Sequence, residues 1–155
     1  MKFGASTACF YPLETEKALK KVCELGYKYA EVFMNAPSEL EEPFLKQLNT
    51  IAKDGGTDIV SVHPFSSFME SSCIFTDYQR RFDDFISIYD KTCHAAAVLG
   101  AEYVVIHGAV AHPKIPIPDE RYFDRFNKLI EIGKRERRGR NGRLSRSCLY
   151  HQNSA

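Results

Sequence analysis

The chain has 155 residues, of which 44% are hydrophobic and 26% are charged, a composition typical of one soluble globular domain with a substantial core. Its net charge of +1 gives no overall field for nucleic acid, and no apolar run approaches the roughly 20 residues that span a bilayer. Its five cysteines are scattered without a CxxC pair, and the N-terminus lacks the apolar stretch of a secretory signal. We therefore expect a cytoplasmic protein without a disulfide framework and without membrane partners.

The near-zero net charge hides an asymmetry between two segments. Residues 1–134 carry 15 Lys and Arg against 19 Asp and Glu, a net charge of −4, whereas residues 135–155 carry six Arg and one Glu, a net charge of +5. The second segment has no apolar periodicity and no aromatic residues interleaved with its arginines. We predict a folded domain over 1–134 and a disordered Arg-rich tail over 135–155, for which nucleic acid is not the expected partner.

Within residues 1–134, short apolar stretches alternate with amphipathic helical patterns. Four strand–helix pairs result, which indicates a parallel α/β sheet rather than an all-α or all-β domain. Between the third strand and the third helix, the Ser-rich stretch Phe65–Phe75 is expected to be a loop, and Thr76 with Gln79 fits a helix capping box. The predicted strands are Phe3–Ala8, Tyr29–Phe33, Asp58–Val62 and Tyr103–Ile106, and the predicted helices are Thr15–Leu25, Glu42–Asp54, Thr76–Leu99 and a fourth that follows Asp119.

The stretch Ala95–Ala109, AAAVLGAEYVVIHGA, shows the arrangement most clearly. Gly100 suits the left-handed conformation that ends a helix. The following run VVI is continuous rather than alternating, as in strands that are covered on both faces. His107 stands directly after that run, at the carboxyl end of the strand, where parallel α/β proteins place their chemistry.

Three polar side chains of the predicted strands are candidates for a functional site. His63 ends the third strand, and Pro64 keeps it out of the helical region. His63 and His107 would be metal ligands or partners of a substrate hydroxyl, since a neutral imidazole does either; the alternative is a hydrogen bond to the loop that follows each strand. Glu31, on the face of its strand opposite Ala30, would be a general base, a ligand or, as we favour, a hydrogen-bonded anchor.

Other residues near the strand ends admit simpler interpretations. His94 is expected on a helix face, and His112 in an exposed loop, with a second ligand as the alternative for His112. Phe10, Phe65 and Phe68 would form an apolar wall for a sugar or would pack ordinarily, and packing is favoured for Phe68.

The segments FGASTACF, GYKYAEVF, DIVSVHPF and LGAEYVVIHGA, in that order, resemble the first four strands of the xylose isomerase-like TIM barrels. The most specific parts are Gly26 and Tyr27 before Glu31, and the LGA…VVIHGA pattern. A Rossmann or P-loop fold is not supported, because no GxGxxG follows the first strand and no GKS or GKT is present. The resemblance implies about four βα units of a TIM barrel over residues 1–134.

This superfamily includes sugar and sugar-phosphate isomerases and epimerases and the endonuclease IV type of abasic-site nuclease. The resemblance implies a small-molecule sugar or sugar phosphate as substrate, with His63, His107 and Glu31 in the substrate pocket. In the nuclease branch, His63 and His107 match zinc ligands. The resemblance places the usual metal-binding Glu, Asp, His and Glu on strands five to eight, so no catalytic residue is assigned here. A divalent metal (Mn, Co, Mg or Zn) is expected for the full-length family rather than for this chain alone.

A complete (β/α)8 barrel takes about 250 residues, and this chain supplies four units. A truncated gene product and a reading-frame shift near Lys134 both explain this, and the abrupt change in composition favours the shift. We expect reduced or no isomerase activity from the chain alone. Two alternatives stay open: a zinc-dependent abasic-site nuclease, which the net charge of −4 disfavours, and a non-catalytic half-barrel that oligomerises through exposed sheet edges.

Overall fold

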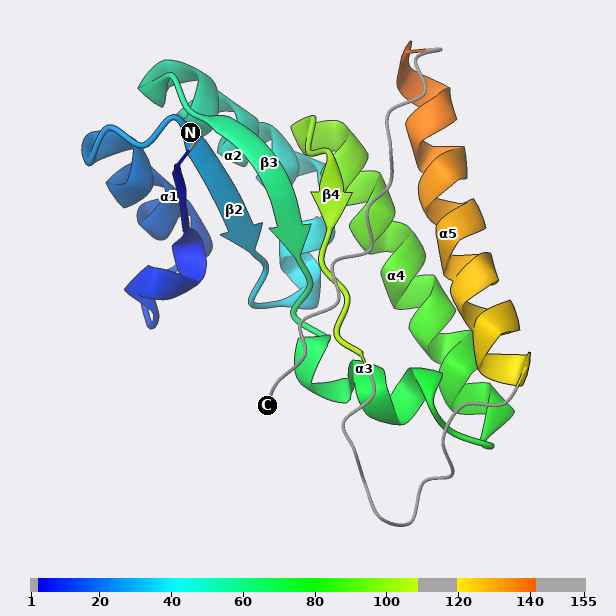
Figure 1. The fold of residues 1–155 in the computed structure, drawn as a ribbon. Coiled ribbons are helices and arrows are strands. Elements are labelled where there is room, and N and C mark those ends of the chain that lie inside the picture. Colours follow the sequence, from blue (N-terminus) through cyan, green and yellow to red (C-terminus); the bar gives the residue numbers. More distant parts are fainter. Residues whose placement is uncertain (1–2, 109–119, 142–155) are drawn as a thin grey trace.

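The computed structural model describes residues 3–108 and 120–141. Its four strands form one sheet in the order β1-β2-β3-β4, and each neighbouring pair is parallel (Figure 1). This confirms the predicted α/β fold with a parallel repeat of strands and helices. The strands are β1 (Gly4–Ser6), β2 (Tyr29–Phe33), β3 (Asp58–His63) and β4 (Tyr103–Val104).

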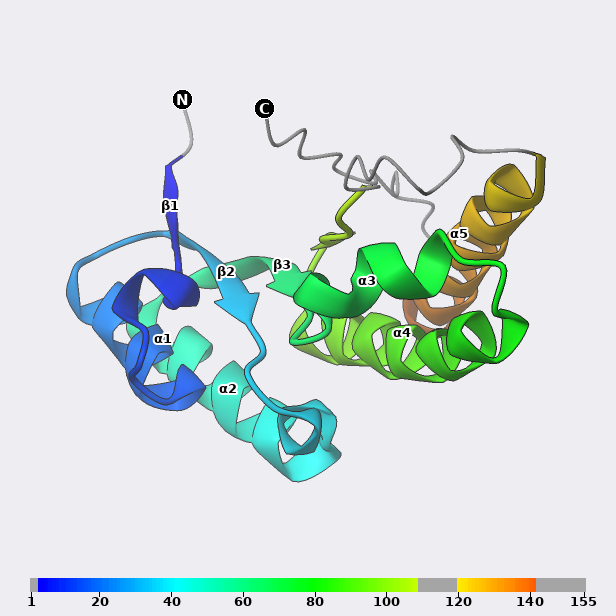
Figure 2. The same cartoon turned by 90° about the horizontal axis from the view of Figure 1, so that it is seen from below.

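Helices follow the strands and cover one side of the sheet. α1, α2 and α4 lie on the same side, α5 runs beside α4, and α3 lies near the carboxyl end of β3 (Figures 1 and 2). None of these helices combines the length and the apolar composition needed to cross a bilayer, within the described ranges. The helical elements are η1 (Thr7–Phe10), α1 (Thr15–Glu24), η2 (Pro37–Leu40), α2 (Glu42–Gly55), α3 (Ser67–Ile74), α4 (Gln79–Leu99) and α5 (Glu120–Asn141), where η marks a 3-10 helix.

Two apolar clusters hold these layers together. The first lies between the sheet and helices α1, α2 and α4, and it takes alternate residues of β2: Ala30 and Val32 are fully buried, whereas Glu31 between them is only half-buried. The second cluster joins α3, α4 and α5, and it also takes in Ile106, two residues after β4. The alternation along β2 therefore leaves Glu31 on the face that the helices do not cover, as predicted.

The connection from α4 to the candidate site follows the expected course. Gly100 has a φ of +73° and ends α4. The backbone N–H of Val105 donates to the carbonyl of Val62 at 3.0 Å, so pairing with β3 continues one residue beyond β4. This pairing carries the chain alongside β3 to His107 at the carboxyl edge of the sheet.

The stretch predicted as a loop contains helix α3. Its sequence SFMESSCI has no amphipathic period, which is why the sequence pattern missed the helix. Tertiary contacts stabilise it instead, because Glu70 and Ile74 are fully buried. The predicted capping box is also wrong: Thr76 Oγ1 accepts from the backbone N–H of Tyr78, and α4 begins at Gln79 without a side-chain cap.

The tail expected to be disordered from residue 135 is helical as far as Asn141. Arginine is a good helix former, and contacts with α4 support this part of α5: Arg135 pairs with Asp90, and Glu136 lies 3.3 Å from the ring of His94. The boundary at residue 134 is therefore not the end of regular structure. The rest of the predicted tail, 142–155, and His112 lie outside the described residues.

Candidate active site at the carboxyl edge of the sheet

The two predicted histidines lie together at the ends of adjacent strands. The rings of His63, which ends β3, and His107, three residues after β4, have centroids 4.9 Å apart and planes at 64°. The other side of the His63 ring is stacked on Phe33, the last residue of β2, with centroids 4.5 Å apart. Parallel pairing of the strands thus brings three successive strand ends into one cluster.

Burial keeps His63 in its neutral form. It lowers the pKa of the imidazole below its ordinary value; the Glu31 carboxylate raises the pKa and the His107 ring lowers it further. The Nδ1 atom of His63 is buried and has no hydrogen-bond partner among the described residues. A neutral imidazole can bind a hydroxyl or a cation, which in His63 would need a ring nitrogen other than the buried Nδ1.

Glu31 lies on the open face of the sheet. Its Oε2 atom accepts a hydrogen bond from Ser61 Oγ at 3.2 Å, across the β2–β3 pair. The extra residue that lets Glu31 face Ser61 is Val60, at an irregularity of β3. A hollow of about 550 Å³ on this face is lined by Phe3 to Ser6, Tyr29 to Glu31, Val60, Glu102 and Tyr103.

Glu70 belongs to the site although sequence reasoning missed it. Its side chain comes from α3, is completely buried, and reaches His107 twice through one oxygen. Glu70 Oε2 accepts from the backbone N–H of His107 at 2.7 Å and lies 3.0 Å from the His107 ring nitrogen Nδ1. Burial raises the pKa of the Glu70 carboxyl, against the two His107 contacts that lower it. A glutamate in a segment without periodicity gave no signal in the sequence.

The remaining candidates have separate positions. Phe10 and Phe65 pack against the core of the sheet, whereas Phe68 is 82% exposed, so the packing expected for Phe68 is wrong. Phe68 is on the eight-residue helix α3, which buries Glu70 and Ile74 instead.

Comparison with protein-family models finds no match, and comparison with curated proteins finds none either. Solved structures do match in fold. A D-tagatose 3-epimerase-like protein has a TM-score of 0.70 at 20% identity over 88% of this chain and 50% of its own length. The D-psicose 3-epimerase of Clostridium cellulolyticum H10, solved with D-tagatose, has a TM-score of 0.66 at 11% identity over 87% of this chain and 50% of its own length. A xylose isomerase-like TIM barrel protein of Mycobacterium smegmatis, in complex with magnesium, has a TM-score of 0.58 at 16% identity over 88% of this chain and 52% of its own length.

Over the part that it covers, this chain has the fold of these TIM barrels. It spans about half the length of the solved structures that it matches. The predicted resemblance is therefore confirmed at the level of fold, and identities of 20% or less leave the activity to be argued from the site. The roles assigned to His63, His107 and Glu31 stay predictions.

The described residues do not by themselves form a metal centre. His63 and His107 are the right residue type and are adjacent, but no group of three or more His, Cys, Asp or Glu side chains is arranged to hold an ion within residues 3–108 and 120–141. Two imidazoles are fewer than the three protein ligands of a typical catalytic zinc site. We therefore derive no chemical step through a metal.

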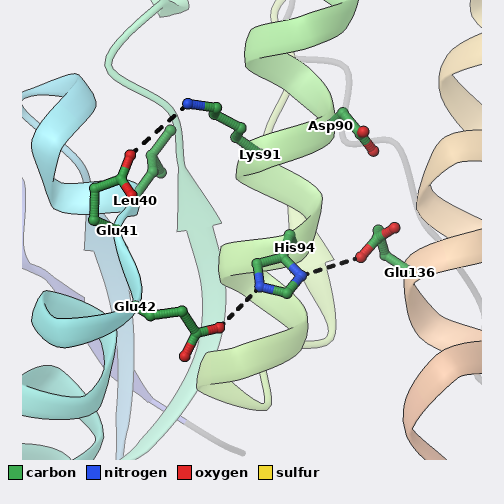
Figure 3. Close-up of a pocket in the computed structure, with 7 residues that line it drawn as sticks. All are labelled: Leu40, Glu41, Glu42, Asp90, Lys91, His94 and Glu136. Carbon is green, nitrogen blue, oxygen red and sulfur yellow. Dashed lines mark hydrogen bonds and ion pairs between the residues drawn. The ribbon is translucent and has the colours of Figure 1, made fainter.

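A second hollow, of about 360 Å³, lies in the helical layer (Figure 3). Its central residue is His94 of α4, whose two ring nitrogens face two carboxylates: Nε2 lies 3.0 Å from Glu42 of α2, and Nδ1 lies 3.3 Å from Glu136 of α5. Contacts on both nitrogens suit a protonated ring that donates to each side. His94 thus joins three helices, a structural role that agrees with the helix-face position expected from the sequence.

The charge of His94 predicts a pH-dependent stability. The hydrogen bond with Glu42 raises its pKa, and Glu136 raises it too, against a smaller lowering by burial. Because the folded-state pKa exceeds the ordinary 6.5, the stabilisation is complete below pH 6.5 and is lost as pH rises through the folded-state value. Asp90 and Lys91 of α4 and Arg135 of α5 also face the hollow or its rim. The His94 side chain is half exposed, so we expect its charged contacts to contribute less than about 1 kcal/mol to the free energy of unfolding.

Urea unfolding of the wild type and His94→Gln from pH 5.5 to 9 measures this effect. The difference in unfolding free energy should be largest at low pH and should shrink as pH rises. The opposite titration of His63 is common to both proteins and cancels in the difference. A constant difference across this range would contradict the assignment.

Proposed function

We propose that this chain forms the sugar-contacting part of a sugar or sugar-phosphate isomerase or epimerase. The observation that carries the proposal is the pair of histidines at adjacent strand ends, with ring centroids 4.9 Å apart. The solved structures that share this fold support it, since they include a D-psicose 3-epimerase bound to D-tagatose. The four described cysteines are free thiols, which supports a place in the reducing cytoplasm.

The chemistry of the cluster suits a polyhydroxylated ligand. A neutral imidazole offers one donor and one acceptor, and two of them on neighbouring strands match two hydroxyls of a sugar. The Glu31 carboxylate already accepts a hydrogen bond from Ser61 and can accept another from a hydroxyl of the ligand. The ring of Phe33 beside His63 adds apolar surface for the carbon skeleton of the ligand.

Catalysis would need groups beyond this cluster. The chain spans about half the length of its structural neighbours, and one of those neighbours was solved with magnesium. We propose that this chain binds the substrate weakly and isomerises it slowly or not at all on its own.

Two other functions are each supported by one observation of the structure. The paired imidazoles also suit a zinc-dependent abasic-site nuclease, although the acidic charge of residues 1–134 opposes phosphate binding. In the described sheet, β1 and β4 each pair on one side only, which supports a non-catalytic half-barrel that associates through its edges.

Titration of the full chain with D-tagatose, followed by the ring resonances of its histidines in NMR spectra, tests the proposal. We expect saturable shifts of His63 and His107 but not of His94, and binding about tenfold weaker in His107→Ala. The matched control, His94→Ala, should bind like the wild type. Absence of saturable shifts, or equal binding by His107→Ala, would overturn the proposal.

The same preparations separate the alternatives. Incision of an abasic duplex that is lost in His107→Ala favours the nuclease. A mass that rises with concentration in sedimentation, together with no ketose binding, no ketose isomerisation in Mn²⁺ or Co²⁺ and no incision, favours the non-catalytic half-barrel.

A further inference from the structure

We propose that Glu70 is the positioning residue of the strand-end cluster: it holds the His107 ring as the tautomer that carries its proton on Nδ1, which leaves Nε2 as the nitrogen that accepts from a ligand. This inference refines the proposed function by stating which atom of His107 meets the sugar. It rests on the contacts of His107 with Glu70, a residue of α3 to which the resemblance to known barrels assigns no role.

One oxygen of Glu70 receives both donors of His107. Oε2 lies 2.7 Å from the backbone nitrogen and 3.0 Å from Nδ1. The backbone N–H can only donate, so Oε2 already acts as an acceptor. An oxygen that accepts one hydrogen bond and carries no proton accepts a second from Nδ1–H, as in the carboxylate–histidine pairs that fix a ring in other enzymes.

The alternative protonation state fits this geometry less well. A protonated Glu70 could donate to an unprotonated Nδ1 only from Oε2, because that is the oxygen in contact. The same oxygen would then both donate to the ring and accept from the backbone at 2.7 Å. A proton on Oε1 instead leaves Oε2 free to accept from both donors of His107. In either charge state of Glu70, Oε2 therefore remains the acceptor for Nδ1–H.

Burial makes the arrangement rigid. The Glu70 side chain is 0% exposed, and Ile74, one turn later on α3, is also fully buried. The carboxyl therefore has no freedom to follow a moving ring, and its two contacts fix both the position of the His107 backbone and the rotation of the imidazole. Oε1 is buried and has no partner among the described residues, so the contacts of this carboxyl with His107 all pass through Oε2.

The orientation of His107 sets that of its neighbour. The edge-to-face contact with His63, at 4.9 Å between centroids, depends on the rotation of both rings. His63 is held on its other side by Phe33, and its buried Nδ1 has no partner in the described region. With Glu70 in place, two imidazoles are presented in a fixed relation to a ligand; without it, the His107 ring is free to rotate and to exchange its tautomers.

Two-bond ¹H–¹⁵N spectra of the histidine rings test the proposal directly on the full chain. At pH 8, where imidazoles are mostly neutral, His107 of the wild type should show a protonated Nδ1 and an unprotonated Nε2. Glu70→Ala should convert His107 to a mixture with at least about half of the Nε2–H form. Glu70→Gln, which retains an acceptor oxygen and the side-chain volume, should restore the wild-type tautomer. A wild-type His107 in the Nε2–H form overturns the proposal, and so does an unchanged tautomer in Glu70→Ala.

A structural role alone would change stability without changing the tautomer. The matched control is Ser72→Ala, which removes the bond from the Ser72 hydroxyl to the Met69 carbonyl on the same helix and should leave the His107 spectrum unchanged. A changed His107 spectrum in Ser72→Ala would attribute the effect to α3 in general and would overturn the specific role of Glu70. The wild-type and Glu70→Gln spectra decide the question where Glu70→Ala fails to fold.

Sugar binding provides the second measurement. The dissociation constant for D-tagatose should rise about tenfold in Glu70→Ala and should change less than threefold in Glu70→Gln. Failure of the proposed function gives a different result. Neither the wild type nor any variant then binds the ketose, yet the His107 tautomer still changes in Glu70→Ala and is kept in Glu70→Gln. If the His107 tautomer changes in Glu70→Ala but the affinity for the ketose does not, Glu70 has no role in positioning the substrate, and the proposed function still stands.

Discussion

Replacing Arg125 with methionine is expected to lower the free energy of unfolding by about 3 kcal/mol. Arg125 is on α5 and is only 8% exposed. Its Nη1 atom donates to the backbone carbonyls of Ile74 and Thr76, each at 2.6 Å, and Nη2 donates to the Gln79 side chain at 3.1 Å. Methionine keeps the apolar stem but leaves the two carbonyls between α3 and α4 without their partner, and hydrogen bonds to a charged donor are among the stronger ones.

The matched control is Lys128→Met, three residues later on the same helix. Both residues place a cation against the Phe82 ring, at 4.6 Å for Arg125 and 5.6 Å for Lys128, so both substitutions remove a charge from one aromatic surface. Only Arg125 also caps the carbonyls. In urea unfolding, Lys128→Met should cost less than about 1 kcal/mol. Equal losses in the two variants would show that the carbonyl contacts of Arg125 contribute little.

The sheet and the histidine pair were predictable because local patterns determine them. The third strand ends at His63 and the apolar run of the fourth leads to His107, and parallel pairing in chain order places consecutive strand ends next to one another. His63 and His107 therefore had to lie near each other once four parallel units were inferred, and the structure gives a centroid separation of 4.9 Å. The face taken by Glu31 followed in the same way from the period of two along β2.

Glu70 and Arg125 were not predictable by the same means. Each is a charged residue whose burial depends on contacts with residues between 37 and 51 positions away in the chain. The pattern around Glu70 lacks a helical period, and the pattern around Arg125 indicates a helix with its charged residues in water. Long-range polar contacts leave no periodic signal, because one residue suffices to make them.

The helical part of the Arg-rich segment shows a related limit. A run rich in arginine and poor in apolar residues indicates disorder on composition alone. The segment is nevertheless helical as far as Asn141, and two of its residues contact α4: Arg135 pairs with Asp90, and Glu136 lies 3.3 Å from the ring of His94. Composition does not reveal that a neighbouring helix offers charges of the opposite sign at matching positions.

Replacing Gly55 with alanine is expected to destabilise the protein by about 2 kcal/mol, although alanine is the better helix former. Gly55 is the last residue of α2, where this helix crosses α1. A Cβ atom at residue 55 would lie 2.5 Å from the Sγ atom of Cys23 and closer still to its Cβ atom. The Cβ atom of Cys23 is fixed to the backbone of α1, so relief requires the two helices to separate and to open the core contacts of Leu19 and Leu48.

Gly133→Ala is the matched control, because Gly133 is also helical but an added Cβ would meet its nearest atom, the Tyr89 hydroxyl, only at 4.0 Å. This change should stabilise the protein by about 0.5–1 kcal/mol through helix propensity alone. Substitutions of Cys23 combined with Gly55→Ala identify which contact causes the loss of stability. Cys23→Ala removes the sulfur but keeps the Cβ atom, so it should not rescue Gly55→Ala, whereas Cys23→Gly should recover part of the loss despite its own cost in α1. If Cys23→Ala rescues fully, the sulfur rather than the approach of the two helices limits residue 55.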